Sequence, residues 1–282
     1  MSAVLFDVPG PKARVRHRIY TVVGLAGLAA VLAWVLWTLW QKEQITPDKW
    51  TAFGNPRILG ALVQGMGVTL VTAAAAIALA VAYGAVFAFG RLSDHAILRV
   101  PSVAIVEFFR AVPLVLLILF IFLGIGNVIG TFWSLVLGLT LYNGSVLAEI
   151  FRAGILAVPR GQSEAGYALG MRKYQVMTEI LSPQAVRAML PAIISQCIVA
   201  LKDTALGYII AAPGVTRIGQ LIFINPLYRN PLAVGIVIAA FFIVVNYALS
   251  KLAEWVEARM RRRGTTPLPA RAANIPDESA LT

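Results

Sequence analysis

Six long apolar stretches constrain the fold of this 282-residue chain more than any other feature of its sequence. A helix needs about 20 apolar residues to cross a bilayer. Stretches of that kind cover Ile19–Trp40, Leu62–Phe89, Val103–Leu123, Val128–Ala148, Met189–Ala212 and Leu232–Ser250. The sequence therefore predicts an all-α integral membrane protein with six transmembrane helices.

The composition indicates lipid rather than water as the solvent. Only 13% of the residues are charged, against about 25% in soluble globular domains, and the mean hydropathy is +0.79. The net charge of +11 lies in the tails and between the apolar stretches, which is typical of topology signals and of contact with anionic lipid rather than of nucleic-acid binding. A single cysteine excludes an intrachain disulfide. The two histidines have no partner at metal-ligand spacing, so we expect no metal site.

Hydropathy and charge together divide the chain into segments. Residues 1–18 form a basic tail, 19–40 an extra N-terminal anchor, 60–250 the main transmembrane domain, and 251–282 a second tail that we expect to be disordered after 264. Lysine and arginine are frequent in both tails and between the fourth and fifth spans, and scarcer in the segments that alternate with these. Because an excess of positive charge marks cytoplasmic segments, we expect both termini and the loop 155–183 to be cytoplasmic.

The loop 155–183 has the signals of a helix, a glycine turn and a second helix. Ser163 is a candidate N-cap, and Glu164 after it favours the first turn. Gly170 is placed to end the short helix in the left-handed conformation. A second helix then runs to Ser182, and Pro183 either breaks it or begins the next one. Such a segment is exposed enough to dock a partner.

This loop resembles the cytoplasmic signature of importer permeases, E-A-A-x3-G-x9-I-x-L-P. The positions that match are Glu164, Ala165, Gly170, Ile180 and Pro183, while Gly166 and Ser182 depart from the signature. The flanking motifs resemble the polar amino acid permease family of ABC-type importers, whose members serve histidine, glutamine, arginine and glutamate. Those motifs are EFFRAVP (107–113), AEIFRAGI (148–155), PRGQ (159–162) and LKDTAL (201–206). The similarity covers residues 60–250 and looks closest to actinobacterial glutamate permeases.

The resemblance implies a type I ABC importer permease core of five spans, located in the bacterial plasma membrane. It implies that Glu164, Ala165, Gly170, Ile180 and Pro183 dock an ATPase through a coupling helix. The expected partners are a cytoplasmic nucleotide-binding ATPase dimer, a second permease subunit, an external solute-binding protein, membrane lipid and a small polar amino acid. The chain has no phosphate-binding G-x-x-x-x-G-K-[ST] loop. We therefore expect a transport subunit rather than an enzyme, with no cofactor of its own and with ATP-Mg on the partner.

Polar residues inside the apolar stretches are candidates for the transport path, because an ionisable group costs about 2.5–3.5 kcal/mol at the bilayer centre. Lys202 and Asp203 fit the carboxylate and ammonium of an amino acid, or form ion pairs between helices. Glu107 and Arg110 either contact substrate or neutralise each other on one helix face. Asn143 lines the path or bonds between helices.

Two other classes of protein remain open on the sequence alone. An ion-coupled secondary transporter or channel would also carry charges inside its spans, but it needs no docking loop. A non-transporting membrane scaffold would leave the charges at 202 and 203 without a purpose. The loop signature favours the ATP-driven importer over both, and dependence of uptake on ATP distinguishes them.

Overall fold

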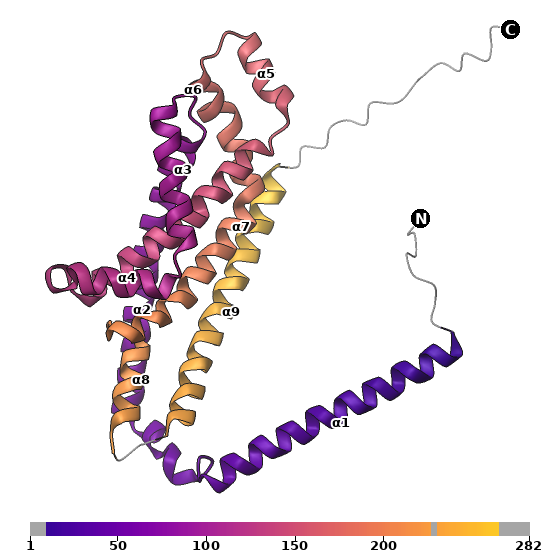
Figure 1. The fold of residues 1–282 in the computed structure, drawn as a ribbon, viewed down its shortest axis with the longest axis vertical. Coiled ribbons are helices and arrows are strands. Elements are labelled where there is room, and N and C mark those ends of the chain that lie inside the picture. Colours follow the sequence, from indigo (N-terminus) through magenta and orange to yellow (C-terminus); the bar gives the residue numbers. More distant parts are fainter. Residues whose placement is uncertain (1–9, 227–229, 265–282) are drawn as a thin grey trace. The chain divides into compact units, whose positions relative to one another are not determined.

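The structure is a computed structural model that describes residues 10–226 and 230–264, and the regular elements of that part of the chain are helices joined by turns and short irregular segments. The expected disorder after 264 and residues 1–9 of the tail 1–18 lie outside the described residues. The chain divides into two compact units, residues 1–59 with 221–236, and residues 60–220 with 237–282. Figure 1 shows the elements in chain order.

The helices follow the apolar stretches of the sequence. They are α1 (Pro11–Gln41), α2 (Pro56–Arg91), α3 (Ala96–Ala111), α4 (Leu114–Leu156), α5 (Arg160–Ala168), α6 (Lys173–Gln175), α7 (Ser182–Asp203), α8 (Val215–Ile224) and α9 (Pro231–Gly264). A π-helical turn (Val176–Leu181) joins α6 to α7, and 3-10 helices cover Pro47–Gly54 and Thr204–Ile210.

Five helical stretches of the described chain are long and apolar enough to cross a membrane. They are Lys12–Gln41, Pro56–Arg91, Leu114–Leu156, Lys173–Ile210 and Pro231–Trp255. The expectation of six separate spans differs at one place, since the third and fourth expected spans do not form two matching helices. The all-α membrane architecture itself is as expected.

The expected third span, Val103–Leu123, is wrong because the helix breaks inside it. α3 ends at Ala111 and α4 begins at Leu114. Pro113 between them has no backbone N–H, and its ring disfavours the helical conformation for the residue before it; Val112 is accordingly extended, with ψ of 129°. Pro113 is the sequence signal for this break.

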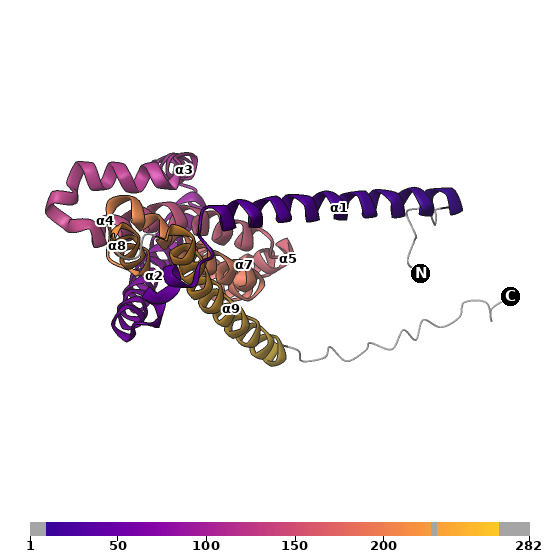
Figure 2. The same ribbon diagram turned by 90° about the horizontal axis from the view of Figure 1, so that it is seen from below.

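α4 contains a second break, at Gly130. With 43 residues, a straight helix would be about 65 Å long, twice the hydrocarbon core of a bilayer. Gly130 has φ 77° and ψ 170°, a conformation that glycine reaches without steric cost. The two parts of α4 therefore run in different directions, as Figure 2 shows, and the part after Gly130 contains the expected fourth span.

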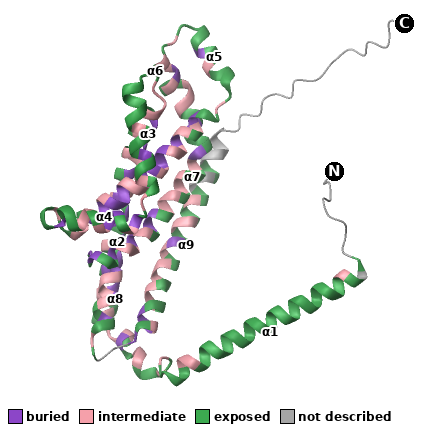
Figure 3. Cartoon of the chain, viewed as in Figure 1, coloured by how far each residue is buried: buried purple, intermediate pink, exposed green. Residues whose placement is uncertain are grey.

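Buried residues concentrate in the larger unit, whereas α1 is exposed along nearly all of its length (Figure 3). Within that unit α4 packs chiefly against α7. One buried cluster joins α4 to the segment after α7, with Ile118, Leu135, Leu139 and Ile210 among its members. α4 thus packs against both α7 and the segment that follows it, and α7 carries the candidate path residues.

A close approach between α2 and α4 predicts the cost of one substitution. A Cβ atom at Gly84 would lie 2.9 Å from the Cβ of Leu147 and 3.0 Å from the carbonyl oxygen of Gly144. We expect Gly84→Val to destabilise the protein by about 1–3 kcal/mol, since such overpacking forces backbone shifts, with a lower melting temperature and less monodisperse protein in detergent. Gly67→Val, on the same helix but with open space at the Cβ position, is the control, and equal melting temperatures of the two variants would contradict the packing.

Candidate functional site

The short helix α5 is held at the surface of the larger unit by its own sequence. Its N-cap is Pro159 and it begins at Arg160, so the expected N-cap at Ser163 is wrong. The hydroxyl of Ser163 instead donates to the carbonyl oxygen of Arg160 at 2.7 Å. Proline favours helix starts because its missing N–H is not needed there, and the early start places Glu164 beyond the first turn.

Gly170 ends α5 as expected. Its φ is +78°, and its N–H donates to the carbonyl oxygen of Tyr167 at 2.9 Å. The N–H of Met171 donates to the carbonyl oxygen of Gly166 at 3.1 Å. This pair of bonds is the Schellman motif, which closes a helix on a left-handed glycine. The turn directs the chain back towards α6 beside α5.

The inner face of α5 rests on the π-helical turn. A Cβ atom at Gly166 would lie 2.8 Å from Cδ1 of Ile180 and 2.9 Å from Cγ2 of Val176. Gly166, the departure from the signature, is buried at this contact. Glu164 and Ala165 are exposed, as are Tyr167 and Leu169, which sequence reasoning had not singled out.

The five expected docking residues therefore take different places. Glu164 and Ala165 lie on the open face of α5, and Gly170 forms its closing turn. Ile180 lies behind α5, where it contacts Gly166, and Pro183 lies exposed in the first turn of α7. Four of the five, namely Glu164, Ala165, Gly170 and Pro183, are thus exposed, whereas Ile180 is half-buried.

Pro183 begins α7 without interrupting the helical path. It has no N–H to donate to the turn before it, and its ring crowds the carbonyl four residues earlier. The chain accommodates it by widening that turn into a π-helix, and the hydroxyl of Ser182 donates to the carbonyl oxygen of Met177 at 2.7 Å. As a result Lys173–Ile210 forms one continuous helical stretch that is long and apolar enough to cross a membrane.

An ion pair connects α6 to the turn between α2 and α3. Lys173 pairs with Asp94, and its ammonium also donates to the carbonyl oxygen of Leu92 at 3.2 Å. The hydrogen bond and charge of Lys173 lower the pKa of the exposed Asp94 carboxyl. The contribution of this pair to stability is therefore present above the ordinary aspartate pKa and is lost as the pH falls through the lowered value.

Polar side chains inside the bundle form a second feature, between α4 and α7. The Nδ2 group of Asn143 donates to the carbonyl oxygen of Leu139 at 3.2 Å and lies 3.4 Å from Oδ2 of Asp203. Its Oδ1 accepts a hydrogen bond from Nε2 of Gln196 at 2.7 Å. Asn143 is 1% exposed, and it thus bonds between helices. Sequence reasoning missed Gln196, because a neutral amide in an apolar stretch gives no charge signal.

Lys202 and Asp203 point in different directions, as expected for neighbours about 100° apart on a helix. Asp203 is half-buried and faces Asn143 on α4, whereas Lys202 is exposed and faces α9. Within the described part of the chain, neither residue takes part in an ion pair. Lys202 and Asp203 therefore do not form the alternative that the sequence left open, an ion pair between helices, within this part of the chain.

Glu107 and Arg110 belong to a larger charge cluster at the ends of α2, α3 and α4. They lie 3.6 Å apart. The guanidinium of Arg91 lies 3.1 Å from Oε1 of Glu107 and 3.0 Å from Oε2 of Glu149. Glu149 also forms an ion pair with Arg152, at 2.5 Å. The cluster joins the three helices. On α4, Glu149 lies about 9 Å along the helix axis from Asn143, because the two residues are six positions apart and the rise is about 1.5 Å per residue.

Glu149 is the acidic residue with the most partners in this cluster, since Arg91, Arg110 and Arg152 all lie within 4 Å of its carboxylate. Glu149→Gln raises the net charge of the cluster from +1 to +2 and leaves Arg91, whose side chain is 9% exposed, with one acidic partner. We expect a loss of about 2 kcal/mol, between the values for exposed and buried pairs, seen as a lower melting temperature in detergent. Glu254→Gln, which removes an exposed pair with Lys251, is the control; an equal decrease in both variants would contradict this role.

The described helices, with an exposed docking-type loop at one end and polar residues inside the bundle, define a multi-pass membrane transport subunit. Residues 76–262 match the family described as "Binding-protein-dependent transport system inner membrane component". The chain belongs to this family. The resemblance inferred from the loop signature is thereby confirmed.

Similar proteins narrow the comparison. The chain is 41% identical over 248 residues to the glutamate transport system permease protein GluD of Corynebacterium glutamicum, covering 85% of this chain and 90% of that protein. It is 33% identical over 207 residues to the probable glutamine ABC transporter permease protein GlnP of Bacillus subtilis, covering 71% and 94%. A solved amino acid ABC transporter with histidines contains a chain 29% identical, with a TM-score of 0.66, covering 72% of this chain and 95% of that one. The expected type I ABC importer permease fold is confirmed.

Proposed function

We propose that this chain is the membrane subunit of an ATP-driven importer that moves polar amino acids, glutamate foremost, into the cytoplasm. One observation carries the proposal above the others, namely the arrangement of the docking helix α5. Its outer face is exposed, and its buried inner face rests directly on the helical stretch that enters the membrane. The relatives named for glutamate and glutamine transport support the choice of substrate.

The geometry offers a path for coupling. A cytoplasmic ATPase contacts the outer face of α5 at Glu164 and Ala165. α5 transmits displacement to the π-helical turn through the contact of Gly166 with Ile180. From Ile180 the helical stretch continues to Asp203 over about 35 Å, at 1.5 Å per residue, which is about the thickness of the hydrocarbon core. Closure of the ATPase pair thus shifts the polar residues of α7 relative to α4 and α9, and alternating access follows.

The polar residues of α7 and α4 then line the transport path. Asp203 carries a carboxylate that one bond from Asn143 only partly satisfies. A substrate ammonium is a suitable partner, because hydrogen bonds between charged groups are the strongest that side chains form. The charge cluster around Glu149 and Arg91 lies beyond this region on α4. The distribution of lysine and arginine supports a cytoplasmic location for α5 and both termini.

The remaining parts of the importer are separate chains. Two ATPase subunits supply ATP-Mg, a second permease subunit completes the membrane part, and an external solute-binding protein delivers the amino acid. The membrane of function is the bacterial plasma membrane. Each of these partners is an expectation for this chain that the family it belongs to supports.

Uptake by the complete transporter in proteoliposomes tests the proposal. We expect labelled L-glutamate to accumulate with ATP on the ATPase side, to stop with a non-hydrolysable ATP analogue, and to continue when ionophores dissipate the ion gradients. Uptake that stops with ionophores and ignores ATP would instead assign the chain to the ion-coupled transporters.

A further inference from the structure

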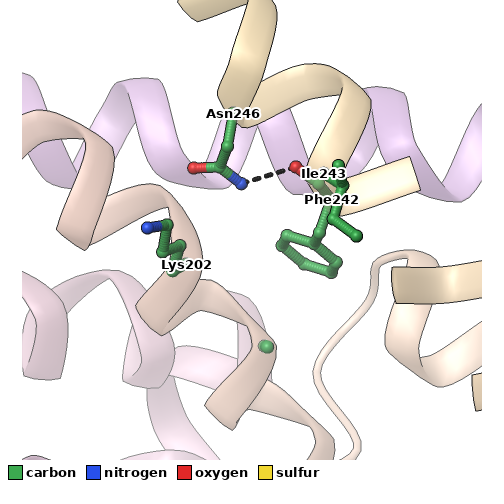
Figure 4. Close-up of a pocket in the computed structure, with 5 residues that line it drawn as sticks. Lys202, Phe242, Ile243 and Asn246 are labelled. Carbon is green, nitrogen blue, oxygen red and sulfur yellow. Dashed lines mark hydrogen bonds between the residues drawn. The ribbon is translucent and has the colours of Figure 1, made fainter. Parts of the chain in front are cut away.

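A cavity between α7 and α9 combines one cation with otherwise apolar walls. Its volume is about 400 Å³, and the residues that line it are Lys202, Ala205, Phe242, Ile243 and Asn246 (Figure 4). All five belong to the larger unit. Sites for small molecules commonly have about 300–1,000 Å³, with apolar walls and a few polar groups. The cavity has the size and the composition of such a site.

Asn246 supplies a polar atom that nothing in the described structure satisfies. Its side chain is 9% exposed, and its Nδ2 group donates to the carbonyl oxygen of Phe242 at 2.7 Å. That bond fixes the amide, so that Oδ1 lies on the side of Lys202 (Figure 4). Among the described residues Oδ1 has no hydrogen-bond partner. A buried orphan acceptor of this kind points to a ligand or an ordered group that the site receives.

Lys202 supplies the complementary charge. Its ammonium has three N–H donors, and within residues 10–226 and 230–264 no carboxylate forms an ion pair with it. The neighbouring Asp203, about 100° away around the helix, faces Asn143 instead. An ammonium in a largely apolar cavity within a membrane span requires an anionic partner, because the charge is otherwise poorly solvated.

We propose that Lys202 and Asn246 form a carboxylate-binding site for the transported amino acid. When the ligand is bound, Oδ1 of Asn246 accepts one N–H of the Lys202 ammonium and orients it, and the other two donate to the ligand carboxylate. The apolar side chains of Phe242 and Ile243 beside the ammonium lower the local polarity, which strengthens the ion pair. Because α7 and α9 each contribute one of the two polar groups, movement of α7 forms or opens the site. The inference rests on the proposed function and deepens it by assigning the carboxylate end of the substrate.

Chemical labelling of Lys202 tests the site on the complete transporter. Reductive methylation modifies only the neutral amine, and peptide mass spectrometry reports its rate at each lysine. In nanodiscs of phosphatidylcholine, we expect L-glutamate to slow the labelling of Lys202 by about tenfold, since the bound carboxylate engages the N–H groups of the amine and covers it from the reagent. The exposed Lys251, paired with Glu254, is the control in the same digest, and its rate stays unchanged. We expect Asn246→Leu to abolish the protection.

The second arm separates the amino acid from lipid, since phosphatidylserine also carries a carboxylate. Nanodiscs with phosphatidylserine but no amino acid provide this comparison. Protection by phosphatidylserine and not by L-glutamate would overturn the assignment to the substrate, as would equal labelling of Lys202 with and without L-glutamate. Either outcome leaves ATP-dependent uptake by the wild-type transporter intact, so failure of this site is distinct from failure of the proposed function.

Discussion

Glu164→Arg is expected to stop transport while the chain still folds and inserts. Glu164 lies exposed on the outer face of α5, and among the described residues it has no ion pair or side-chain hydrogen bond, so its replacement leaves the fold unchanged. The charge reversal instead affects the surface that we assign to the ATPase. Central contacts of protein interfaces contribute about 2 kcal/mol or more, and we expect ATP-driven uptake to fall by more than about tenfold.

The measurement is uptake of labelled L-glutamate by cells or proteoliposomes, normalised to the amount of inserted protein. Glu179→Arg is the matched control, because Glu179 is also exposed but lies in the π-helical turn behind α5. Normal uptake by a stably expressed Glu164→Arg protein would contradict the docking role. Equal loss in both variants would indicate a general electrostatic effect of the loop.

Asp203→Asn is expected to have the second large effect, through substrate binding. The substitution keeps the size of the side chain and an oxygen that can accept from Asn143, but removes the negative charge. A hydrogen bond to a charged group contributes about 1.5–3 kcal/mol, so uptake should fall by about tenfold to a hundredfold. The folded protein should be no less stable, because a neutral amide costs less to bury in the membrane than a carboxylate.

Uptake as a function of L-glutamate concentration, together with the melting temperature in detergent, measures both parts of this expectation. Asp48→Asn, which neutralises an exposed aspartate in the 3-10 helix Pro47–Gly54, is the control. Unchanged uptake by Asp203→Asn would remove this carboxylate from the transport path. A decrease in melting temperature that parallels the loss of uptake would assign it a structural role instead.

The sequence predicts the membrane helices well because the bilayer imposes a strict length and apolar composition. Gly170 is predictable for a similar reason, since few residues other than glycine tolerate its positive φ. Breaks inside apolar stretches are harder to predict. Pro113 interrupts a helix at a position where hydropathy alone shows no boundary, whereas the break at Gly130 lies two residues after the expected start of the fourth span at Val128. The expected N-cap at Ser163 is wrong because proline and serine both favour helix starts, and Pro159 comes first in the chain.

The contacts of the candidate site depend on packing that one sequence does not encode locally. The i,i+3 spacing of Glu107 with Arg110 and of Glu149 with Arg152 is visible in the sequence, but their connection through Arg91 on α2 is not. Lys202 and Asp203 stand out as charges in an apolar stretch. The polar groups near them are the neutral amides of Asn143, Gln196 and Asn246, which gave either a weak signal or none.

The central claim is that α5 docks a separate ATPase, and affinity purification of the tagged chain from its native membrane tests it most directly. We expect mass spectrometry to identify a nucleotide-binding ATPase with a G-x-x-x-x-G-K-[ST] motif in the wild-type preparation and its loss from the Glu164→Arg preparation. Recovery of the chain without any ATPase, in a detergent that keeps known membrane complexes intact, would contradict the claim and favour a gradient-driven transporter.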